Sequence, residues 1–286
     1  MVYALIALGY TMVYGVLQLI NFAHGEVFMV GAFLTLTAIG LVSAWIGPVS
    51  LWFLLPCVLL FSMAGCALLG ALIEKTAYRP LRGSPKLTAL ISSIGVSFFL
   101  QNAVMLLYGS KEKILPEILP AWQVDLGGVT LTLVQGIIFA VSIGLMFLLT
   151  WFVKKTMLGK AMRASAENAE AAALMGISVG SVIRLTFVIG SALAAVGGSL
   201  FAMNYGSINF HDGYLAGIKA FTAAVFGGIG SIPGAMIGGL LLGVFEGLGA
   251  GYISSEWKDV FAFALLIAVL LFRPTGILGE NSPEKV

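Results

Sequence analysis

Apolar residues run along this chain in nine long blocks that are separated by short polar stretches. The blocks are continuous rather than alternating, which favours helices over strands, and a spanning helix needs about 20 mainly apolar residues. They lie at 2–20, 26–46, 50–73, 87–107, 131–153, 185–204, 216–228, 234–252 and 259–272. The pattern predicts an all-α, polytopic helical membrane bundle of about eight transmembrane helices, within a range of about seven to nine, in a single transmembrane domain over 1–286.

The seventh and eighth blocks are separated only by a glycine-rich stretch around Pro233. They are either two crossings joined by a tight turn or one crossing with a re-entrant or broken segment near 228–234. No lysine followed by serine or threonine comes after these glycines, so a phosphate-binding loop is not expected there.

Composition agrees with a membrane protein and leaves no room for a sizeable soluble domain. Of the 286 residues, 59% are hydrophobic and 10% are charged, against about 25% charged in an ordinary soluble domain. Cys57 and Cys66 have no partner ligands at metal-binding spacing. The chain also lacks a catalytic constellation of serine, histidine and acid, and a basic aromatic patch. We therefore expect no enzyme activity, no catalytic residue, no metal and no nucleic acid.

Basic residues gather in three places along the chain. Eleven of the fifteen Lys and Arg residues lie in segments 74–86 and 154–184 and in the C-terminal tail, which holds Arg273 and Lys285. Because basic loops are retained on the cytoplasmic side, the loop 154–184 and the C-terminus are predicted to be cytoplasmic. The side on which the N-terminus lies stays open.

The segment 154–176 is a charged, alanine-rich island in an otherwise apolar chain. Good helix formers and a terminal glycine predict one helix from Leu158 to Met175 that stops at Gly176. Helical spacing gives this helix a charged face and a face of small residues. The two faces comprise Lys160, Arg163, Glu167 and Glu170, and Met162, Ala166, Ala169 and Ala173, respectively. The helix either docks another protein or lies solvated on the lipid headgroups.

Polar residues interrupt the apolar sequence between the first two blocks. Asn21, His24 and Glu26, with Gly25 among them, indicate a broken helix or a tight turn. Such a break exposes backbone groups and could form a gate or line a pathway. Alternatively, Asn21 caps one helix and Glu26 stabilises the positive end of the next.

A second intramembrane acid, Glu246, lies within a stripe of glycines. Gly239, Gly243, Gly247 and Gly251 recur every four residues, which favours close packing against another helix or subunit. Glu246 is then either partnered within that packing, protonated, or part of a pathway; its charge state stays open. Gln101 and Asn102 are expected to form hydrogen bonds between helices.

Three stretches resemble a known family. Glu170-Ala171-Ala172, followed after three residues by Gly176, resembles the E-A-A-x-x-x-G loop of ATP-binding-cassette (ABC) importer permeases. Residues 20–31, INFAHGEVFMVG, and residues 218–240 look like the corresponding segments of branched-chain amino acid permeases. The resemblance covers essentially the whole chain and begins part-way into the first span of that family.

The resemblance implies a permease subunit of the inner membrane for ATP-driven uptake of leucine, isoleucine or valine. The expected partners are a second homologous permease in a heterodimer, two cytoplasmic ATPase subunits and an extracytoplasmic binding protein. ATP and Mg²⁺ would be bound by the ATPases, with no cofactor in this chain. The coupling residues implied are Arg163, Glu167, Glu170, Ala171, Ala172 and Gly176.

Two alternatives remain. The cargo could be urea, a short amide or another amino acid, because the sequence does not identify the solute. Less consistent with the motifs is a stand-alone secondary transporter with His24, Glu26 and Glu246 as a proton relay.

Overall fold

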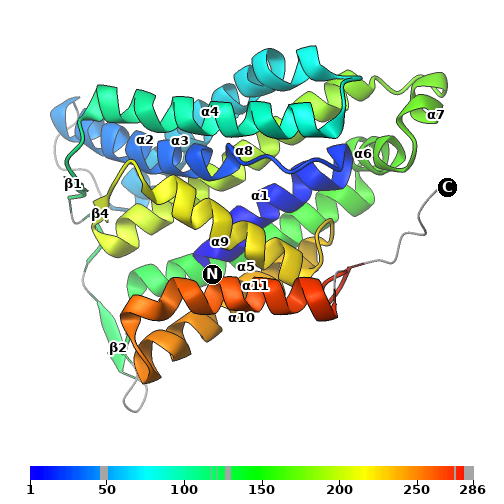
Figure 1. Ribbon diagram of the computed structural model, residues 1–286. Helices are drawn as coiled ribbons and strands as arrows, with labels where there is room; N and C mark the ends of the chain where they lie inside the picture. The colour runs from blue at the N-terminus through cyan, green and yellow to red at the C-terminus, as the bar shows by residue number, and fades with distance from the viewer. Residues whose placement is uncertain (46–50, 117, 121, 126–129, 274, 280–286) are drawn as a thin grey trace.

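The protein is a bundle of α-helices, most of which run roughly along one direction (Figure 1). The computed structural model describes residues 1–45, 51–116, 118–120, 122–125, 130–273 and 275–279, and only the backbone of Leu51 and Trp52. Its α-helices are α1 (Val2–Leu17), α2 (His24–Trp45), α3 (Leu51–Ile73), α4 (Lys86–Tyr108), α5 (Leu133–Lys155), α6 (Met157–Glu167), α7 (Ala169–Leu174), α8 (Val179–Tyr205), α9 (Asp212–Gly227), α10 (Ile232–Tyr252) and α11 (Lys258–Phe272).

Each of the nine apolar blocks contains one of these helices, so the prediction of a polytopic helical bundle is confirmed. Six helices of the described residues are long and apolar enough to cross a membrane: α2, the continuous helical stretch Phe53–Leu81, α4, α5, α8 and α10. Helices α1, α9 and α11 have 16, 16 and 15 residues, fewer than the roughly 20 of a full span.

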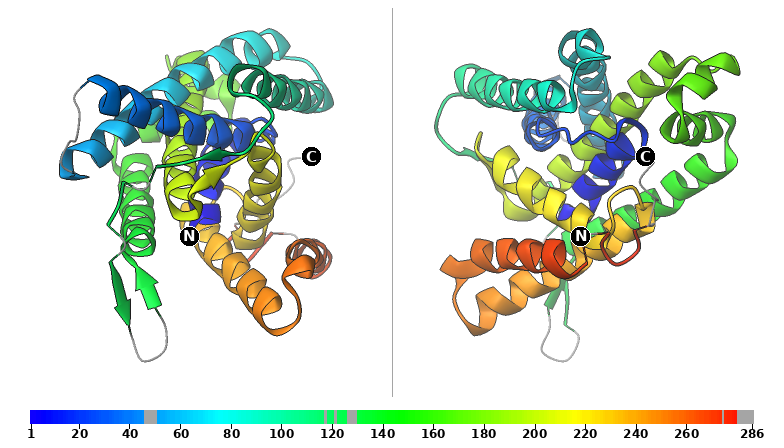
Figure 2. Two further views of the ribbon diagram at one scale, coloured as in Figure 1. Left: turned by 90° about the vertical axis from the view of Figure 1, so that its left-hand side faces the viewer. Right: turned by 45° about the vertical axis from the view of Figure 1, so that its right-hand side comes forward.

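Helix α8 forms the centre of the bundle and packs along α1, α2 and α3. Residues 4–13 of α1 are all buried, because α8, α9 and α10 surround them. Helix α4 lies on the outside (Figure 2) and exposes Phe98 and Phe99. Exposed phenylalanines on an outer helix are what a lipid-facing surface requires.

Four short strands lie outside the apolar blocks. Strand β1 (Lys113–Ile114) pairs antiparallel with β4 (Ser207–Ile208), and β2 (Gln123–Asp125) pairs antiparallel with β3 (Thr130–Thr132). Both pairs lie at the end of the bundle opposite α6 and α7 (Figure 1), and β2 and β3 project from it (Figure 2).

Helices α9 and α10 form a tight antiparallel hairpin. The turn between them comprises residues 228–231, and the Ser231 hydroxyl caps α10 by accepting a hydrogen bond from Gly234 N at 3.2 Å. Pro233 therefore lies in the first turn of α10, where its missing N–H costs nothing, and not in the turn itself. A methyl group at Gly238 would overlap the carbonyl oxygen of Ala223, so glycine permits the close packing.

The basic segments 74–86 and 154–184 meet at one end of the bundle. Arg82 donates a hydrogen bond to the Gly180 carbonyl at 3.5 Å, and both Arg82 and Arg184 pair with Glu74. Arg273 follows α11 at the same end (Figure 1). Lys285, which the charge pattern assigns to this side, lies outside the described residues.

Candidate functional site

A break in the helical structure lies between α1 and α2. Helix α1 ends in Gln18, which has φ 52°, and six residues in positions 18–23 precede α2. The Asn21 side-chain oxygen accepts hydrogen bonds from Ala23 N at 3.1 Å and from the Tyr78 hydroxyl at 3.0 Å. The broken helix predicted from the sequence is thus present. Asn21 shapes the start of α2, whereas the capping interpretation had it close the preceding helix, whose C-cap is Gln18.

His24 and Glu26 are both 1% exposed at the start of α2. The His24 ring lies edge-on to Tyr10, with centroids 4.7 Å apart, against Gly9 of α1. Glu26 Oε1 accepts a hydrogen bond from the Ser97 hydroxyl at 3.2 Å. In the described part of the chain, Glu26 Oε2 and His24 Nε2 have no hydrogen-bond partner. Unsatisfied buried polar atoms are costly, which sets this region apart from ordinary packing.

The same break occurs a second time, between α8 and α9. Residues 20–22 and 208–210 both read Ile-Asn-Phe. Exactly the same spacing of 188 positions separates Gln18 from Gly206, Asn21 from Asn209 and His24 from Asp212.

The backbone geometry of the two breaks also matches. Gly206, like Gln18, is left-handed, with φ 69°. The Asn209 side chain accepts a hydrogen bond from His211 N at 3.1 Å, as Asn21 does from Ala23 N, and α9 begins at Asp212 as α2 begins at His24. This repeat was not predicted from the sequence, although the shared tripeptide is a visible signal of it.

The two copies run in opposite directions and cross at glycines. Helices α1 and α2 lie antiparallel to α8 and α9 (Figure 1). A methyl group at Gly25 would overlap the carbonyl oxygen of Gly213, and one at Gly213 would meet the Gly25 carbonyl oxygen and Glu26 Oε2. Inverted repeats with broken helices are a recurrent design of membrane transporters.

A row of polar residues on α4 covers both breaks. Ser93 accepts a hydrogen bond from Phe22 N at 3.3 Å, Ser97 donates to Glu26, and Gln101 Nε2 lies 2.7 Å from His211 Nδ1. The spacing of four residues places all three on one face of α4. Gln101 was expected to bond another helix, and it bonds His211, the residue directly before α9. Asn102 instead bonds the Phe98 carbonyl of its own helix, so the expectation for Asn102 was wrong.

Glu246 belongs to a separate cluster, at the contact of α9, α10 and α11. Lys219 Nζ lies 2.6 Å from Glu246 Oε1 and 2.6 Å from Asp259 Oδ1, and the Tyr3 hydroxyl is 3.5 Å away. Of the interpretations offered by the sequence, the structure therefore shows the partnered carboxylate. The sequence analysis did not identify Lys219, which is 27 residues from Glu246.

The glycine stripe next to Glu246 packs in this chain at one position. A side chain at Gly239 would overlap Ala4 of α1, whereas no atom of the described residues lies within 4 Å of a methyl group placed at Gly243, Gly247 or Gly251. Of the predicted packing against another helix or subunit, the described residues therefore show contact with a helix of this chain at Gly239. Their packing against a second subunit stays a prediction.

The island 154–176 contains two helices rather than the one predicted. Asn168 has extended backbone angles, φ −156° and ψ 106°, and separates α6 from α7. Its side chain accepts a hydrogen bond from Ala171 N at 3.0 Å, and this capping competes with helix continuation. The predicted stop at Gly176 is confirmed by its φ of 83°.

Because the helix is broken at Asn168, the charged face and the small-residue face predicted for one continuous helix do not form as such. Met162 is 2% exposed and Ala172 is 4% exposed, so both point into the protein. The Arg163 guanidinium donates to the Val153 carbonyl at the end of α5, and Glu167 is the last residue of α6. Glu170, Ala171 and Gly176 are exposed.

Two large apolar side chains stand at the tip of this loop. Leu174 is 89% exposed and Met175 is 83% exposed, at the end of α7 within the basic segment 154–184, and α7 lies at the end of the bundle opposite the strands (Figure 1). The sequence analysis treated both only as helix formers. Exposed apolar side chains beyond a membrane end, rimmed by charge, are typical of a protein docking surface.

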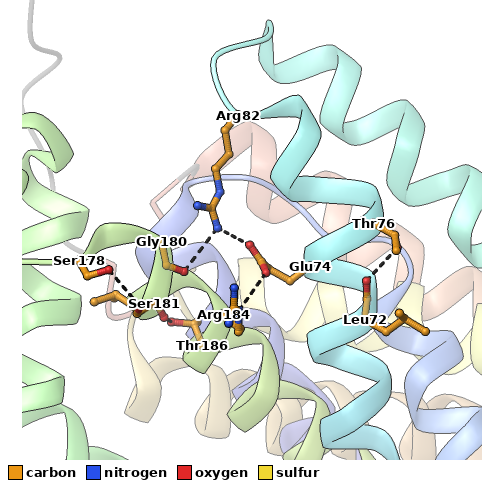
Figure 3. A network of polar contacts seen from close by, with 10 residues as sticks. Leu72, Glu74, Thr76, Arg82, Ser178, Gly180, Ser181, Arg184 and Thr186 are labelled. Carbon is orange, nitrogen blue, oxygen red and sulfur yellow. Dashed lines mark hydrogen bonds and ion pairs between the residues drawn. The ribbon is translucent and has the colours of Figure 1, made fainter.

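Glu74 is a buried carboxylate at the end of α3 that was not identified from the sequence. It connects α3 to the segment before α4 and to the start of α8 (Figure 3). Its side chain is 0% exposed and forms ion pairs with Arg82 and Arg184. Glu74 stands at the end of an apolar block and next to Lys75, so the sequence makes it look like an ordinary loop residue.

Together, the apolar bundle, the inverted repeat and the exposed helical loop define a helical membrane transport protein. The chain belongs to the family of the branched-chain amino acid transport system permease component, which it matches over residues 1–270. No solved structure matches it.

Three relatives illustrate the range of similarity. The chain is 54% identical to the high-affinity branched-chain amino acid transport system permease protein BraD of Pseudomonas aeruginosa, over 99% of this chain and 94% of that protein. It is 49% identical to the permease protein LivH of the same kind of system in Escherichia coli strain K12, over 99% and 93%. The autoinducer 2 import system permease protein LsrC of E. coli strain DH10B is 30% identical over 65% of this chain and 56% of that protein.

Proposed function

We propose that this chain is the membrane-spanning subunit of an ATP-driven importer for leucine, isoleucine or valine. The observation that carries the proposal is the exposed Leu174–Met175 tip on α7, at the basic end of a chain of this family. The tip fits into an apolar groove of a soluble ATPase, and the carboxylate of Glu170 and the open backbone of Gly176 flank it. ATP and Mg²⁺ are then bound by the ATPase and not by this chain.

The arrangement in the membrane follows from the same assignment. The basic end, with the loop 154–184 and the C-terminus, faces the cytoplasm. The strands β1 to β4 face the other side, where an extracytoplasmic binding protein delivers the amino acid. A second homologous permease completes the pathway, and the breaks around Asn21 and Asn209 line its membrane-embedded part. These assignments are supported by the family and by the distribution of charge.

The cargo assignment rests on the names of the relatives that are similar over their whole length. BraD and LivH are branched-chain amino acid permeases by name, whereas the more distant LsrC belongs to an autoinducer 2 system. Binding and uptake measurements with the purified binding protein of the same system would identify the solute. Preference for urea, an amide or another amino acid over leucine, isoleucine and valine would contradict this part of the proposal.

Docking is tested by charge substitution at the tip. Leu174→Glu and Met175→Glu are expected to abolish co-purification of the ATPase, because each places an unpaired charge in an apolar contact. Ile114→Glu is the matched control, since Ile114 is 81% exposed at the opposite end of the bundle. Retention of the ATPase by both tip variants would exclude docking at α7.

The secondary-transporter alternative is tested with the chain alone in liposomes. An importer subunit should accumulate no solute under a proton gradient without its ATPases. Accumulation driven by the gradient alone would overturn the proposal. Because Glu246 is paired with Lys219, a relay through His24, Glu26 and Glu246 lacks a free carboxylate at its third member.

A further inference from the structure

A π-helical turn, η1 (Glu74–Tyr78), directly follows α3 inside the long helical stretch Phe53–Leu81. Turns of this kind are rare, because their wider hydrogen bonding is less favourable than that of an α-helix. Where they occur, they are frequently at functional sites. The first and last residues of this turn, Glu74 and Tyr78, are both buried, at 0% and 4% exposed. Each contacts a different functional region.

Glu74 connects the turn to the start of α8. Its Oε1 accepts a hydrogen bond from Arg82, and its Oε2 lies 3.6 Å from Nε of Arg184 (Figure 3). Arg184 is on the second turn of α8, which begins three residues after Gly176. A buried carboxylate is unfavourable unless it is paired, so this contact holds α8 and the end of α3 together as one unit.

Tyr78 connects the same turn to the break before α2. Its hydroxyl donates to the Asn21 side chain at 3.0 Å, and its ring contacts Phe187 of α8 with centroids 4.8 Å apart. Asn21 in turn shapes the start of α2, where His24 and Glu26 lie. The π-helical turn therefore lies between the exit of the α6–α7 loop and the first broken helix.

We propose that Glu74 and Tyr78 are positioning residues that transmit movement of the α6–α7 loop to the break before α2. The inference rests on the proposed docking of an ATPase at α7. A displacement of α7 moves the start of α8 through Gly176, and α8 moves Glu74 through Arg184. The turn then carries the displacement to Tyr78 and Asn21. The step at Gly176 runs along the chain, the steps at Arg184 and Asn21 are direct side-chain contacts, and we assign the change of form to the π-helical turn.

The two forms of the turn differ in a defined way. Return of residues 74–78 to α-helical bonding rotates the residues after the turn by about 100° around the helix axis, the rotation per residue of an α-helix. That rotation removes the Tyr78 hydroxyl from Asn21, while Glu74, at the start of the turn, stays with Arg184 of α8. The start of α2 is then free to separate from Gly213, so the breaks open in response to the loop.

The test compares solute uptake with ATP hydrolysis in the complete transporter, reconstituted in liposomes with its second permease, ATPases and binding protein. Tyr78→Phe removes the hydroxyl and keeps the ring. We expect it to lower uptake per ATP about fivefold, the factor that corresponds to the loss of one intramolecular hydrogen bond. Co-purification of the ATPase should be unchanged. A purely structural role would lower uptake and hydrolysis together.

Tyr108→Phe is the matched control, because the Tyr108 hydroxyl forms a bond of 2.6 Å with Thr37 near the opposite end of the bundle. This variant should keep the wild-type ratio. Asn21→Ala combined with Tyr78→Phe should be no worse than Asn21→Ala alone, since both remove the same contact. Glu74→Gln should lower the ratio more than Glu74→Asp, which keeps the charge.

The outcomes separate the inference from the proposed function. If Tyr78→Phe keeps the wild-type ratio of solute uptake to ATP hydrolysis, the inference is overturned. If Glu74→Gln does not fold into the membrane, the Tyr78→Phe variant alone provides the test. Absence of ATP-dependent uptake by the wild-type assembly overturns the proposed function instead.

Discussion

The carbonyl oxygen of Gly213 occupies the space that a side chain at Gly25 would need. Through this contact the start of α9 meets the start of α2, at the crossing of the two inverted copies. Gly25 and Gly213 both lie within helices, so neither needs glycine for an unusual backbone conformation. Glycine is required here because the two backbones approach each other closely.

Substitution of this glycine tests the crossing. Gly25→Ala is expected to destabilise the protein by roughly 1–3 kcal/mol, because the added methyl group forces the two helices apart. The measurement is thermal unfolding in detergent. Gly95→Ala on the exposed face of α4, where no described atom lies within 4 Å, should be neutral or slightly stabilising. Equal stability of the two variants would rule out the tight crossing.

The repeat predicts opposite effects at equivalent positions. Gln18 and Gly206 both have left-handed backbone angles, with φ 52° and 69°. Gln18→Gly should stabilise the protein by about 1 kcal/mol, because glycine adopts this conformation without strain. Gly206→Ala should destabilise it by a similar amount. Chemical denaturation of both variants provides the comparison, and changes of the same sign would contradict the equivalence.

Lys219 is predicted to be essential for stability. Lys219→Met leaves Glu246 buried without its cation and should cost roughly 3–5 kcal/mol. Removing the more deeply buried acid as well, as in Lys219→Met with Glu246→Gln, should restore most of the loss, because the remaining partner, Asp259, has a side chain that is 39% exposed and can be hydrated. Unfolding temperatures of the single and double variants are the readout. A double variant that is as unstable as the single one would show that packing, and not charge, is decisive.

The break at Asn168 is predicted to orient α7. Asn168→Ala removes the cap and permits α6 and α7 to merge, so about 1 kcal/mol of stability should be lost from α7. ATP-dependent uptake by the assembled transporter should fall with it. Asn168→Asp keeps an acceptor for Ala171 N and should retain uptake. Full activity of Asn168→Ala would show that a continuous helix can dock equally well.

The helical bundle could be predicted from the sequence because continuous apolar blocks have few alternatives in a bilayer. The break at Asn21 was also predictable, since asparagine, histidine and glutamate interrupt an apolar run. Asn168 was missed because the residues around it, mostly alanine, all favour a helix. Only the competition from its own side chain ends α6 there.

Contacts between distant segments could not be read from spacing. Lys219 and Glu246 meet because α9 and α10 pair through glycines, and the sequence carries no mark of that register. Likewise, Glu74 pairs with Arg184, which α8 brings to it from a distant part of the chain. Such partners are set by tertiary packing rather than by local pattern.

The inverted arrangement also has a consequence for biosynthesis. Helix α1 packs mainly against α8, α9 and α10, and α2 packs largely against α8 and α9, all of which begin at Val179 or later in the chain. We therefore expect the first two helices to complete their packing, including that around His24 and Glu26, only after α8 and α9 have been synthesised. Membrane chaperones that shield this nascent pair would act before α8 emerges.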